Sequence, residues 1–349
     1  MYINNNTQIS FKGIFDPNVL VTGASGYIGS NLVHNLAEKG YNCIINSRNP
    51  EKTEFIEKVV EDVNRNKSNK TLCTFVNLDL LDPQGINNIL QKNAPVDAVV
   101  HLAGATLNAE SLKNPRKYYN NNVGATMNLA NSLLDNGVDK LVFISTGSTY
   151  GKIKTSPVSE INPQIPETPY SRTKLIVEQL LKDYEIHNLK STILRLFNVA
   201  GARTPEDLSI GQNVISVIME KLKTNSLFTL MGNTYDTPDG TCVKDFLHVT
   251  DACDAIGMSV QKLLDNESGD VYNLGSGTGV SLGEIIHKSQ EIADKELKLR
   301  IGEKLATETP ELIVDNTKIK TNLGWKPKHN IDDILRSAWN WTLKNGGVR

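Results

Sequence analysis

The stretch "VTGASGYIG" (residues 21–29) decides the fold class of this chain. It begins with the end of a short apolar run, which predicts a buried strand. Three glycines then follow in the spacing G-x-x-G-x-x-G: Gly23, Gly26 and Gly29. Apolar residues next recur every four positions, as on one face of a helix: Ile28, Leu32 and Leu36. A strand, a tight glycine turn and a helix N-terminus together favour the pyrophosphate of a dinucleotide.

The glycine spacing alone is weak evidence, and its place between a strand and an amphipathic helix gives it weight. We therefore predict a dinucleotide cofactor held by the loop and the first helical turn. The residues expected to contact it there are Gly23, Ser25, Gly26, Tyr27 and Ile28.

Outward from this loop, short apolar runs alternate with helical periodicity. The predicted strands are Val19–Val21, Cys43–Asn46, Thr71–Val76, Ala98–Leu102, Lys140–Ser145 and Thr192–Leu196. Such alternation predicts an α/β fold of the Rossmann type, a doubly wound parallel sheet with helices on both faces. Residues 18–197 would form this domain. Residues 198–349 are more irregular and predict a smaller, mixed α/β substrate lobe, although segments near 245–275 are expected to return to the first domain.

Composition limits the classes of partner. The formal net charge of -2 gives no reason to expect nucleic acid or an anionic membrane. Residues 1–17 are polar and rich in Asn, unlike a signal peptide, and predict a flexible tail. No apolar run approaches the ~18–20 residues that cross a bilayer, so we expect a soluble cytoplasmic protein. The cysteines are far apart in sequence and predict buried thiols, with neither a disulfide nor a metal site: Cys43, Cys73, Cys242 and Cys253.

The second strand and its loop, "NCIINSRNPEK" (residues 42–52), lack an expected carboxylate. In dinucleotide folds this strand usually ends in Asp or Glu, which binds the adenosine ribose hydroxyls. Here it ends in Asn46, Ser47 and Arg48. No carboxylate would repel a 2′-phosphate, and Ser47 and Arg48 could bind one, which favours NADP over NAD. The alternative is that Arg48 is an exposed loop arginine.

Two further segments follow predicted strands. Asp79-Leu80 could face an adenine ring, whereas Asp79 could equally cap the helix ahead of Pro83. The segment "HLAGAT" (residues 101–106) ends the fourth strand with small residues, as a loop lying against a cofactor would. Its expected cofactor contacts are Leu102, Ala103 and Gly104. We interpret His101 as a core residue.

A Tyr–Lys pair gives the first candidate for catalysis. In "TPYSRTK" (residues 168–174), Tyr170 and Lys174 lie four apart on a helix that Pro169 can start. A tyrosine of pKa ~10 is a poor base at pH 7, by roughly 4 kcal/mol. A nearby ammonium and an oxidised nicotinamide can stabilise the phenolate by about that amount. The segment "FISTGSTYG" (residues 143–151) offers hydroxyl partners at Ser145, Thr146, Ser148 and Thr149.

At these residues the chain resembles the extended short-chain dehydrogenase/reductase superfamily, which carries a Ser/Thr–Tyr–Lys triad. Laid against its S-S-x-x-x-Y-G pattern, Thr146 takes the hydroxyl position, and Asn122 takes the place of a structural Asn. Longer stretches resemble the UDP-glucose 4-epimerase branch: "SLKNPRKYYNNNVGATMNL" (111–129), "LRLFNVAGA" (194–202), "GNTYDTPDGTCVKDFLHVTDACDA" (232–255) and "VYNLGSGTG" (271–279). The resemblance runs from about Val19 to Trp341.

The resemblance implies a nucleotide-sugar 4-epimerase. The Tyr170 phenolate would take the C4 hydroxyl proton while the C4 hydride moves to the nicotinamide, and the hydride would return to the opposite face of the 4-keto sugar. Asn122, Tyr170 and Lys174 would also contact the cofactor. The implied substrate contacts are Thr146, Asn198, Asn213, Val214, Met231 and Lys244.

The resemblance also implies a homodimer joined through a four-helix bundle. The helices concerned would be the one around Asn114–Asn136 and the one that begins at Pro169. Their apolar residues are Tyr119, Val123, Met127, Leu134, Leu175, Val177, Leu180, Leu181 and Tyr184. The alternative is that all of these residues are internal core.

The chain departs from the epimerase pattern at three substrate positions. Lys244 stands where the pattern has an arginine that clamps the diphosphate, and lysine loses the bidentate fork. Leu305 and Leu312 replace a second phosphate arginine and a sugar-facing tyrosine. Two other functions therefore stay open: an NADP-dependent 4-keto-sugar reductase on the same scaffold, and a cofactor-binding protein without catalysis.

Overall fold

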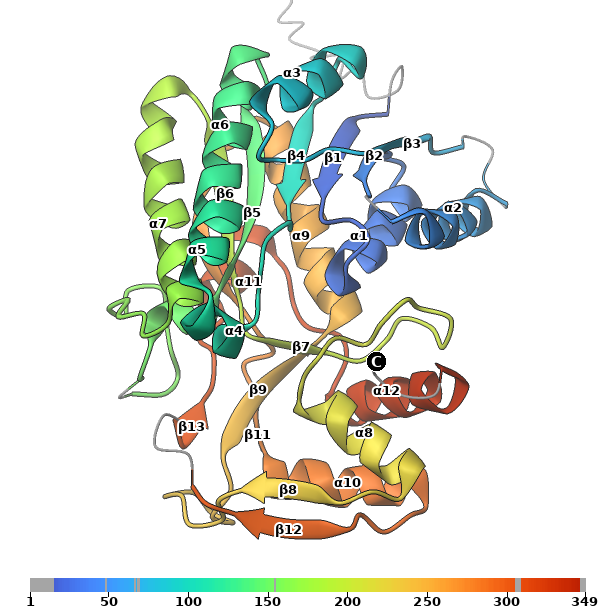
Figure 1. Cartoon of the computed structure of the whole chain (residues 1–349), viewed down its shortest axis with the longest axis vertical. Helices are drawn as coiled ribbons and strands as arrows, with labels where there is room; N and C mark the ends of the chain where they lie inside the picture. The colour runs from blue at the N-terminus through green and yellow to red at the C-terminus, as the bar shows by residue number, and fades with distance from the viewer. Residues whose placement is uncertain are drawn as a thin grey trace, which may run out of the picture.

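The computed structural model describes residues 16–47, 49–65, 67, 70–153, 155–304 and 309–345. Residues 1–15 of the tail predicted at residues 1–17 lie outside the described residues, as do the predicted positions Arg48 and Leu305. A large sheet with flanking helices occupies the upper part of Figure 1, and a smaller group of strands and helices lies below it.

The large sheet has seven parallel strands in the order β10-β6-β5-β4-β1-β2-β3. In chain order they are β1 (Asn18–Thr22), β2 (Asn42–Asn46), β3 (Cys73–Val76), β4 (Ala98–His101), β5 (Lys140–Thr146), β6 (Lys190–Leu196) and β10 (Val271–Leu274). The predicted doubly wound parallel sheet is confirmed, with one more strand than the sequence indicated. β10 has only four residues, and it enters the sheet beside β6 from far along the chain.

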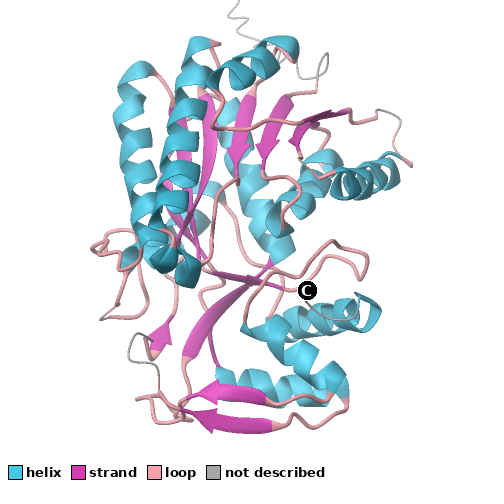
Figure 2. Ribbon diagram, viewed as in Figure 1, coloured by secondary structure: helices cyan, strands magenta, loops and turns pink. Residues whose placement is uncertain are grey.

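Helices cover both faces of this sheet, and each face has its own hydrophobic core (Figure 2). One face carries α1 (Tyr27–Glu38), α2 (Pro50–Asn64) and α9 (Val249–Leu264). The other carries α3 (Pro83–Lys92), α6 (Ala125–Asp135) and α7 (Pro169–Tyr184). The first helix ends as its sequence indicates, because Gly40 takes a φ of 89° just after the cap residue Lys39.

The predicted helix around Asn114–Asn136 is not continuous. It begins as α5 (Pro115–Tyr118), widens into a π-helical segment η1 (Tyr119–Gly124) and continues as α6. A short helix α4 (Asn108–Lys113) precedes it. Apolar periodicity does not distinguish a π turn from an α turn, so the sequence could not show this widening, which lies at a functional position described below.

The smaller lobe is built on a four-stranded sheet. This sheet contains β7 (Asn198–Ala200), β9 (Val243–His248), β11 (Gly279–Ser281) and β13 (Glu311–Leu312). A parallel pair, β8 (Phe228–Met231) and β12 (Leu299–Gly302), lies at the far end. The lobe's helices are α8 (Val214–Thr224), α10 (Leu282–Ala293) and α12 (Ile331–Asn345), which share a third core. A further helix, α11 (Thr317–Leu323), packs on α9 and β10.

Among the described helices, none is long and apolar enough to span a bilayer. The same part of the chain contains no group of three or more His, Cys, Asp or Glu side chains arranged to hold a metal ion. Two of the four free cysteines, distant in sequence, are neighbours in space. Cys43 on β2 and Cys73 on β3 are register partners, a proximity that their spacing in the chain hides.

Candidate active site

The glycine loop lies at the carboxyl end of β1 and permits a close approach of backbone segments. Gly23 has a φ of 71°, and a Cβ there would lie 2.7 Å from the nitrogen of Ala103. A Cβ at Gly29 would lie 2.3 Å from the oxygen of Gly23. Helix α1 starts at Tyr27 after Gly26, and no side chain caps it. The loop therefore fits a pyrophosphate, since uncapped N–H groups and the helix dipole both favour an anion there.

Tyr27 has a second role that the sequence did not reveal. Its hydroxyl donates a 2.7 Å hydrogen bond to the oxygen of Gly201, just beyond β7. Its ring lies against Gly211, where a Cβ would come within 2.8 Å of the ring. The side chain thus fastens the glycine loop to the smaller lobe, and its backbone is left for a cofactor. Ser25 is half-buried in the same loop, and Gly26 is exposed.

The end of β2 carries no carboxylate among its described residues. The side-chain amide of Asn46 pairs with the backbone of Leu78, accepting from its nitrogen at 3.1 Å and donating to its oxygen at 3.2 Å. Ser47 is buried, and its hydroxyl donates to the oxygen of Asn49 at 3.2 Å and accepts from Thr53 Oγ1 at 2.9 Å. Both side chains therefore bond to the chain itself.

Asp79 and Leu80 differ in exposure. Asp79 is exposed, and its carboxylate accepts from the nitrogen of Leu81 at 3.0 Å. Leu80 is buried in the core between the sheet and α3. The alternative in which Asp79 caps the next helix is wrong, because Asp82 occupies the position before Pro83.

His101 is the core residue that the sequence predicted. It is fully buried, and its ring nitrogens lie 2.7 Å from Thr22 Oγ1 and 2.8 Å from Thr126 Oγ1. Burial, together with the charge of Lys174, lowers the pKa of His101 to about 3. A neutral imidazole held between two hydroxyls is fixed in place, and this ring serves to anchor the end of β4.

The loop after β4 lies directly against the candidate triad. Leu102 and Ala103 are half-buried, and Gly104 is exposed. A Cβ at Gly104 would lie 3.0 Å from Asn122 Oδ1 and 3.9 Å from Lys174 Nζ. The glycine therefore leaves space beside the ammonium that a larger residue would fill.

The candidate triad comes together from two elements. Thr146 is the last residue of β5, and Tyr170 and Lys174 lie one turn apart at the start of α7. Thr168 caps this helix by accepting from the nitrogen of Ser171, and Pro169 is its first residue, as predicted. All three candidate side chains are at least nine-tenths buried.

The surroundings of the triad shift the pKa values of Tyr170 and Lys174 in opposite directions. Burial raises the pKa of Tyr170, and a hydrogen bond with Thr146 counteracts that rise. Lys174 Nζ donates to the oxygen of Ile144 at 2.7 Å and lies 4.5 Å above the ring centroid of Phe143. Burial lowers the pKa of Lys174 to about 8, against the charge of Glu178. The ammonium therefore loses its proton more readily than an exposed lysine.

Asn122 connects the loop to the helix. Its Oδ1 accepts from the nitrogen of Ala105 at 2.8 Å, and its Nδ2 donates to the oxygen of Ala105 at 3.0 Å. The same Nδ2 lies 3.0 Å from Thr173 Oγ1, which donates to the oxygen of Tyr170 at 2.7 Å. Asn122 belongs to the π-helical segment η1. It holds the loop after β4 against the turn of α7 that carries Tyr170.

The candidate substrate residues of the smaller lobe lie on neighbouring segments. Asn198 on β7 donates to the oxygen of Asp245 at 3.0 Å, one residue after Lys244 on β9. Asn213 caps α8 and donates to the oxygen of Val199 at 3.1 Å. Half-buried Lys244 is the register partner of Leu312 on β13. Asn198, Asn213 and Lys244 thus belong to one surface of the lobe.

The remaining substrate candidates are at the ends of elements. Val214 is the first residue of α8, and Met231 ends β8 with 40% of its surface exposed. Phe197, which joins β6 to β7, lies beside the end of β5, because a Cβ at Gly147 would lie 2.7 Å from its ring. Gly147 directly follows Thr146, so the glycine admits the aromatic ring beside the end of β5.

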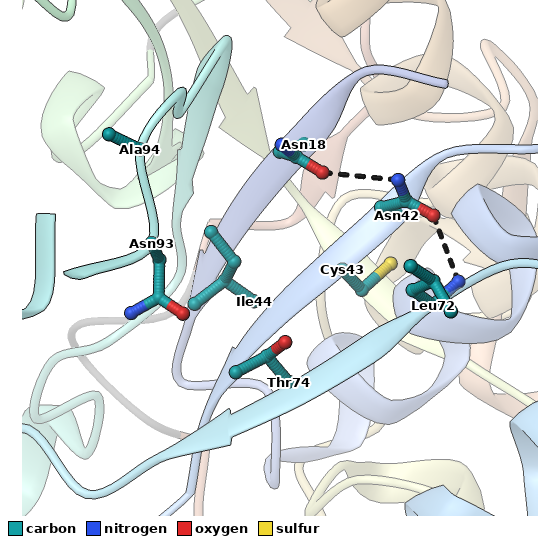
Figure 3. Close-up of a pocket in the computed structure, with 8 residues that line it drawn as sticks. All are labelled: Asn18, Asn42, Cys43, Ile44, Leu72, Thr74, Asn93 and Ala94. Atoms are coloured by element: carbon teal, nitrogen blue, oxygen red, sulfur yellow. Dashed lines mark hydrogen bonds between the residues drawn. The ribbon is translucent and has the colours of Figure 1, made fainter. Parts of the chain in front are cut away.

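A hollow of about 210 Å³ lies elsewhere, at the amino ends of β1, β2 and β3 (Figure 3). Its asparagine side chains are already paired: Asn42 donates to Asn18 Oδ1 at 3.1 Å and accepts from the nitrogen of Leu72 at 2.9 Å, and Asn93 donates to the oxygen of Ile89 at 2.8 Å. The candidate triad and the glycine loop lie at the opposite, carboxyl ends of the strands, where α/β sheets bind ligands. We therefore assign this hollow no part in the active site.

Comparison with known proteins supplies the family. Residues 19–275 match the model of the NAD dependent epimerase/dehydratase family, which covers well over half of the chain. The chain belongs to this family. The match spans the glycine loop, the candidate triad and the return of the chain to the large sheet at β10.

Individual family members resemble the chain over nearly its whole length. UDP-glucose 4-epimerase of Rhizobium meliloti is 36% identical, covering 93% of this chain and 96% of the relative. The enzyme of the same name from Azospirillum brasilense is 33% identical, covering 93% of this chain and 92% of the relative.

Solved structures of the family agree with this fold. UDP-glucose 4-epimerase from Stenotrophomonas maltophila, with bound NAD and formylated UDP-arabinopyranose, superposes with a TM-score of 0.87 at 31% identity, covering 94% of this chain and 98% of that chain. The Bifidobacterium longum enzyme in complex with NAD+ and UDP gives a TM-score of 0.83 at 28% identity, covering 94% and 99%.

Proposed function

We propose that this family member is a nucleotide-sugar 4-epimerase that acts on a UDP-linked hexose with NAD or NADP as its resident cofactor. The observation that carries this proposal is the burial of Thr146, Tyr170 and Lys174 together beside the open Gly104 loop. Relatives named UDP-glucose 4-epimerase over more than nine-tenths of this chain support the reaction and the substrate class.

In this proposal Tyr170 is the acid and base at the C4 oxygen. Its phenolate accepts the hydroxyl proton as the C4–H bond breaks, and its hydroxyl returns that proton when the bond re-forms on the other face. Thr146 holds the sugar oxygen and the phenol in line, and Lys174 stabilises the phenolate by its charge. The nicotinamide, when bound, accepts the hydride and gives it back.

The residues that hold the ligands follow from their places in the fold. The uncapped start of α1 and the glycines before it would bind the cofactor pyrophosphate, and the loop at Leu102–Gly104 would line the nicotinamide. Asn198, Asn213 and Lys244 would bind the sugar nucleotide, with Lys244 as a point charge toward the diphosphate. Because Lys244 and Leu305 stand where the epimerase pattern has its two phosphate arginines, we expect weaker diphosphate binding than an arginine pair would give.

The decisive measurement is the stoichiometry of the cofactor. We expect the purified protein to interconvert UDP-glucose and UDP-galactose with no net change in absorbance at the wavelength of reduced nicotinamide. A panel of other UDP and dTDP sugars would define the substrate. One cofactor oxidised for each sugar reduced would instead identify an NADP-dependent 4-keto-sugar reductase, the function favoured by the lack of a carboxylate at Asn46 and Ser47. Cofactor binding without any sugar conversion would leave only a binding protein.

We also propose that two copies associate through α6 and α7, which run side by side on one face of the large sheet (Figure 1). Val177 and Leu181 belong to the internal core. Tyr119, Met127 and Ile176, however, expose 38%, 41% and 36% of their surfaces. Pairing two such faces as a four-helix bundle would bury these side chains.

Light scattering at micromolar concentration should therefore give the mass of a dimer. The double variant Met127→Glu with Ile176→Glu should give a monomer with unchanged secondary structure, because two charges would be buried in the interface. A monomeric wild-type protein would rule out this assembly.

A further inference from the structure

A buried ion pair lies directly beneath the candidate triad. Glu178 and Arg195 are each 5% exposed. Glu178 Oε2 accepts from Arg195 Nη2 at 2.7 Å and from Arg195 Nε at 3.1 Å. Glu178 Oε1 accepts from the hydroxyl of Ser145, and Gln164 Nε2 donates to Oε2 at 3.0 Å. Every lone-pair direction of this carboxylate is thus directed at a partner, which fixes its position.

This carboxylate joins the two elements that carry the triad. Ser145 directly precedes Thr146 on β5, and Arg195 on β6 is the register partner of Ser145. Glu178 lies on α7, four residues after Lys174 and eight after Tyr170, so the three side chains share one face of the helix. Glu178 therefore fixes both the rotation and the height of α7 over the end of β5.

The far side of the ion pair is fixed as well. Arg195 Nη1 donates to the hydroxyl of Tyr150 at 2.7 Å, and that hydroxyl donates to Asn273 Oδ1 at 2.7 Å on β10. The guanidinium lies 5.1 Å from the centroid of the Tyr150 ring. Because these partners come from β10 and the turn after β5, Arg195 cannot follow Glu178 if that side chain moves.

The charges around Lys174 are few and can be named. From α7 come Tyr170 and the carboxylate of Glu178, which favours the ammonium form. From β4 comes His101, which is neutral. From β6 comes Arg195, which is paired with the Glu178 carboxylate. Removing the Glu178 charge deprives Lys174 of this nearby anion and leaves the Arg195 guanidinium without its counter-charge.

We propose that Glu178 is a positioning residue, which seats α7 on the Ser145–Arg195 pair and supplies the negative charge that keeps Lys174 protonated. The proposal rests on the function proposed above, since it assigns the triad to catalysis. It adds a residue that contacts neither sugar nor cofactor, and it separates two effects, one of geometry and one of charge. Each effect has its own variant.

The charge is tested by Glu178→Gln, which keeps the shape of the side chain. We expect the alkaline limb of the kcat profile to move to lower pH, because Lys174 loses its proton earlier. The ratio of activity at pH 8.5 to that at pH 7 should fall about 3- to 10-fold relative to the wild type. Asp183→Asn, which removes a charge from the exposed side of α7, is the matched control and should leave the profile unchanged.

The geometry is tested by Glu178→Asp, which keeps the charge and shortens the side chain by one methylene. We expect kcat to fall about tenfold at every pH with little change in KM or in the shape of the profile. If Glu178→Gln does not fold, the double variant Glu178→Gln with Arg195→Met removes the orphaned charge as well. That protein should fold and still show a lower ratio of activity at pH 8.5 to that at pH 7 than the wild type, because Lys174 still lacks the neighbouring carboxylate.

A titration that requires no catalysis tests the role of Glu178 independently of the proposed function. The titration of Lys174 itself, followed by NMR of the labelled side chain and assigned with Lys174→Met, should occur at lower pH in the Glu178→Gln background. The Glu178 carboxylate one helical turn away favours the ammonium form, so its loss favours the neutral amine. This shift in a protein that converts no sugar would overturn the function and leave the positioning role. An unchanged titration and pH profile, with kcat of both single variants within twofold of wild type, would overturn the role of Glu178.

Discussion

Replacement of Tyr170 by phenylalanine should lower the turnover number by at least about 100-fold while leaving the fold and cofactor binding intact. General-base contributions are typically ~10²–10⁴-fold, and the substitution removes the only atom of this side chain that can exchange a proton. The ring would keep its place, since Tyr170 is 8% exposed and meets the Tyr118 ring edge-on at a centroid distance of 6.3 Å.

The size of this effect follows from the environment of the phenol. Burial raises the pKa of Tyr170 above its ordinary value of 10.0, so the free hydroxyl is a poor base at pH 7. The hydrogen bond with Thr146 opposes that rise. A protonated Lys174 and the positive nicotinamide would stabilise the phenolate further by their charge. Bridging the three units between pH 7 and a pKa of ~10 takes roughly 4 kcal/mol. Without the phenol oxygen no phenolate can form, and the side chain cannot accept the C4 hydroxyl proton of the sugar.

Tyr41→Phe is a suitable control for this variant. Tyr41 is also buried, at 5% exposure, and its hydroxyl donates to Gln261 near the amino edge of the sheet, away from the triad. Both variants should bind NAD like the wild type in calorimetry and unfold within a few degrees of it. If folded Tyr170→Phe turns over UDP-glucose at a near-normal rate, Tyr170 is not the acid and base, and the assignment of the triad fails.

The sequence predicts the parts of the site that depend on local patterns. The glycine loop can be predicted from the sequence because Gly23 needs a positive φ and Gly29 leaves room for a backbone oxygen. Both requirements select glycine. The start of α7 can be predicted because Thr168 and Pro169 are strong helix-start signals that act within one turn. The approximate positions of the end of β1 and of the start of α7 therefore follow from the sequence alone.

Contacts between distant segments leave no such local pattern. The π-helical turn places Asn122 where it can reach both Ala105 and Thr173, yet the apolar spacing around it fits an ordinary helix. The bond from Tyr27 to Gly201 joins residues 174 positions apart. The ion pair beneath the triad joins Glu178 to Arg195 on another element, and nothing in the spacing of these two residues indicates that they meet. Tertiary packing determines each of these, and a pattern along the chain cannot report it.

The residues at the end of β2 bear on the choice between NAD and NADP. The prediction that Ser47 would donate to a 2′-phosphate meets a competing bond, because its hydroxyl donates to Asn49. The side-chain amide of Asn46 likewise forms hydrogen bonds with the backbone of Leu78. Neither residue supplies a carboxylate to bind the ribose hydroxyls, and neither repels a phosphate. Any preference for NADP therefore rests chiefly on Arg48, which lies outside the described residues.

Changing Ser47→Asp together with Arg48→Ala should reverse a preference for NADP. We propose that the Arg48 guanidinium binds the 2′-phosphate, and such a charge-assisted contact contributes roughly 1.5–3 kcal/mol, or about 10- to 150-fold in affinity. The new carboxylate would repel the phosphate, would accept from Thr53 as Ser47 does, and would offer an acceptor to the ribose hydroxyls of NAD. Binding of NADP should weaken by at least the larger factor, and binding of NAD should hold or improve.

Calorimetry of the wild type and the double variant with both cofactors measures this directly. Lys52→Ala, which removes an exposed cation from the first turn of α2 near the same loop, should alter neither affinity by more than about twofold. A wild-type protein that already prefers NAD would show that Arg48 is only a surface arginine. That outcome would also favour the epimerase over the 4-keto-sugar reductase. An epimerase returns its hydride within each turnover and gains nothing from the NADP pool, whereas a 4-keto-sugar reductase consumes reduced cofactor and needs a supply of it.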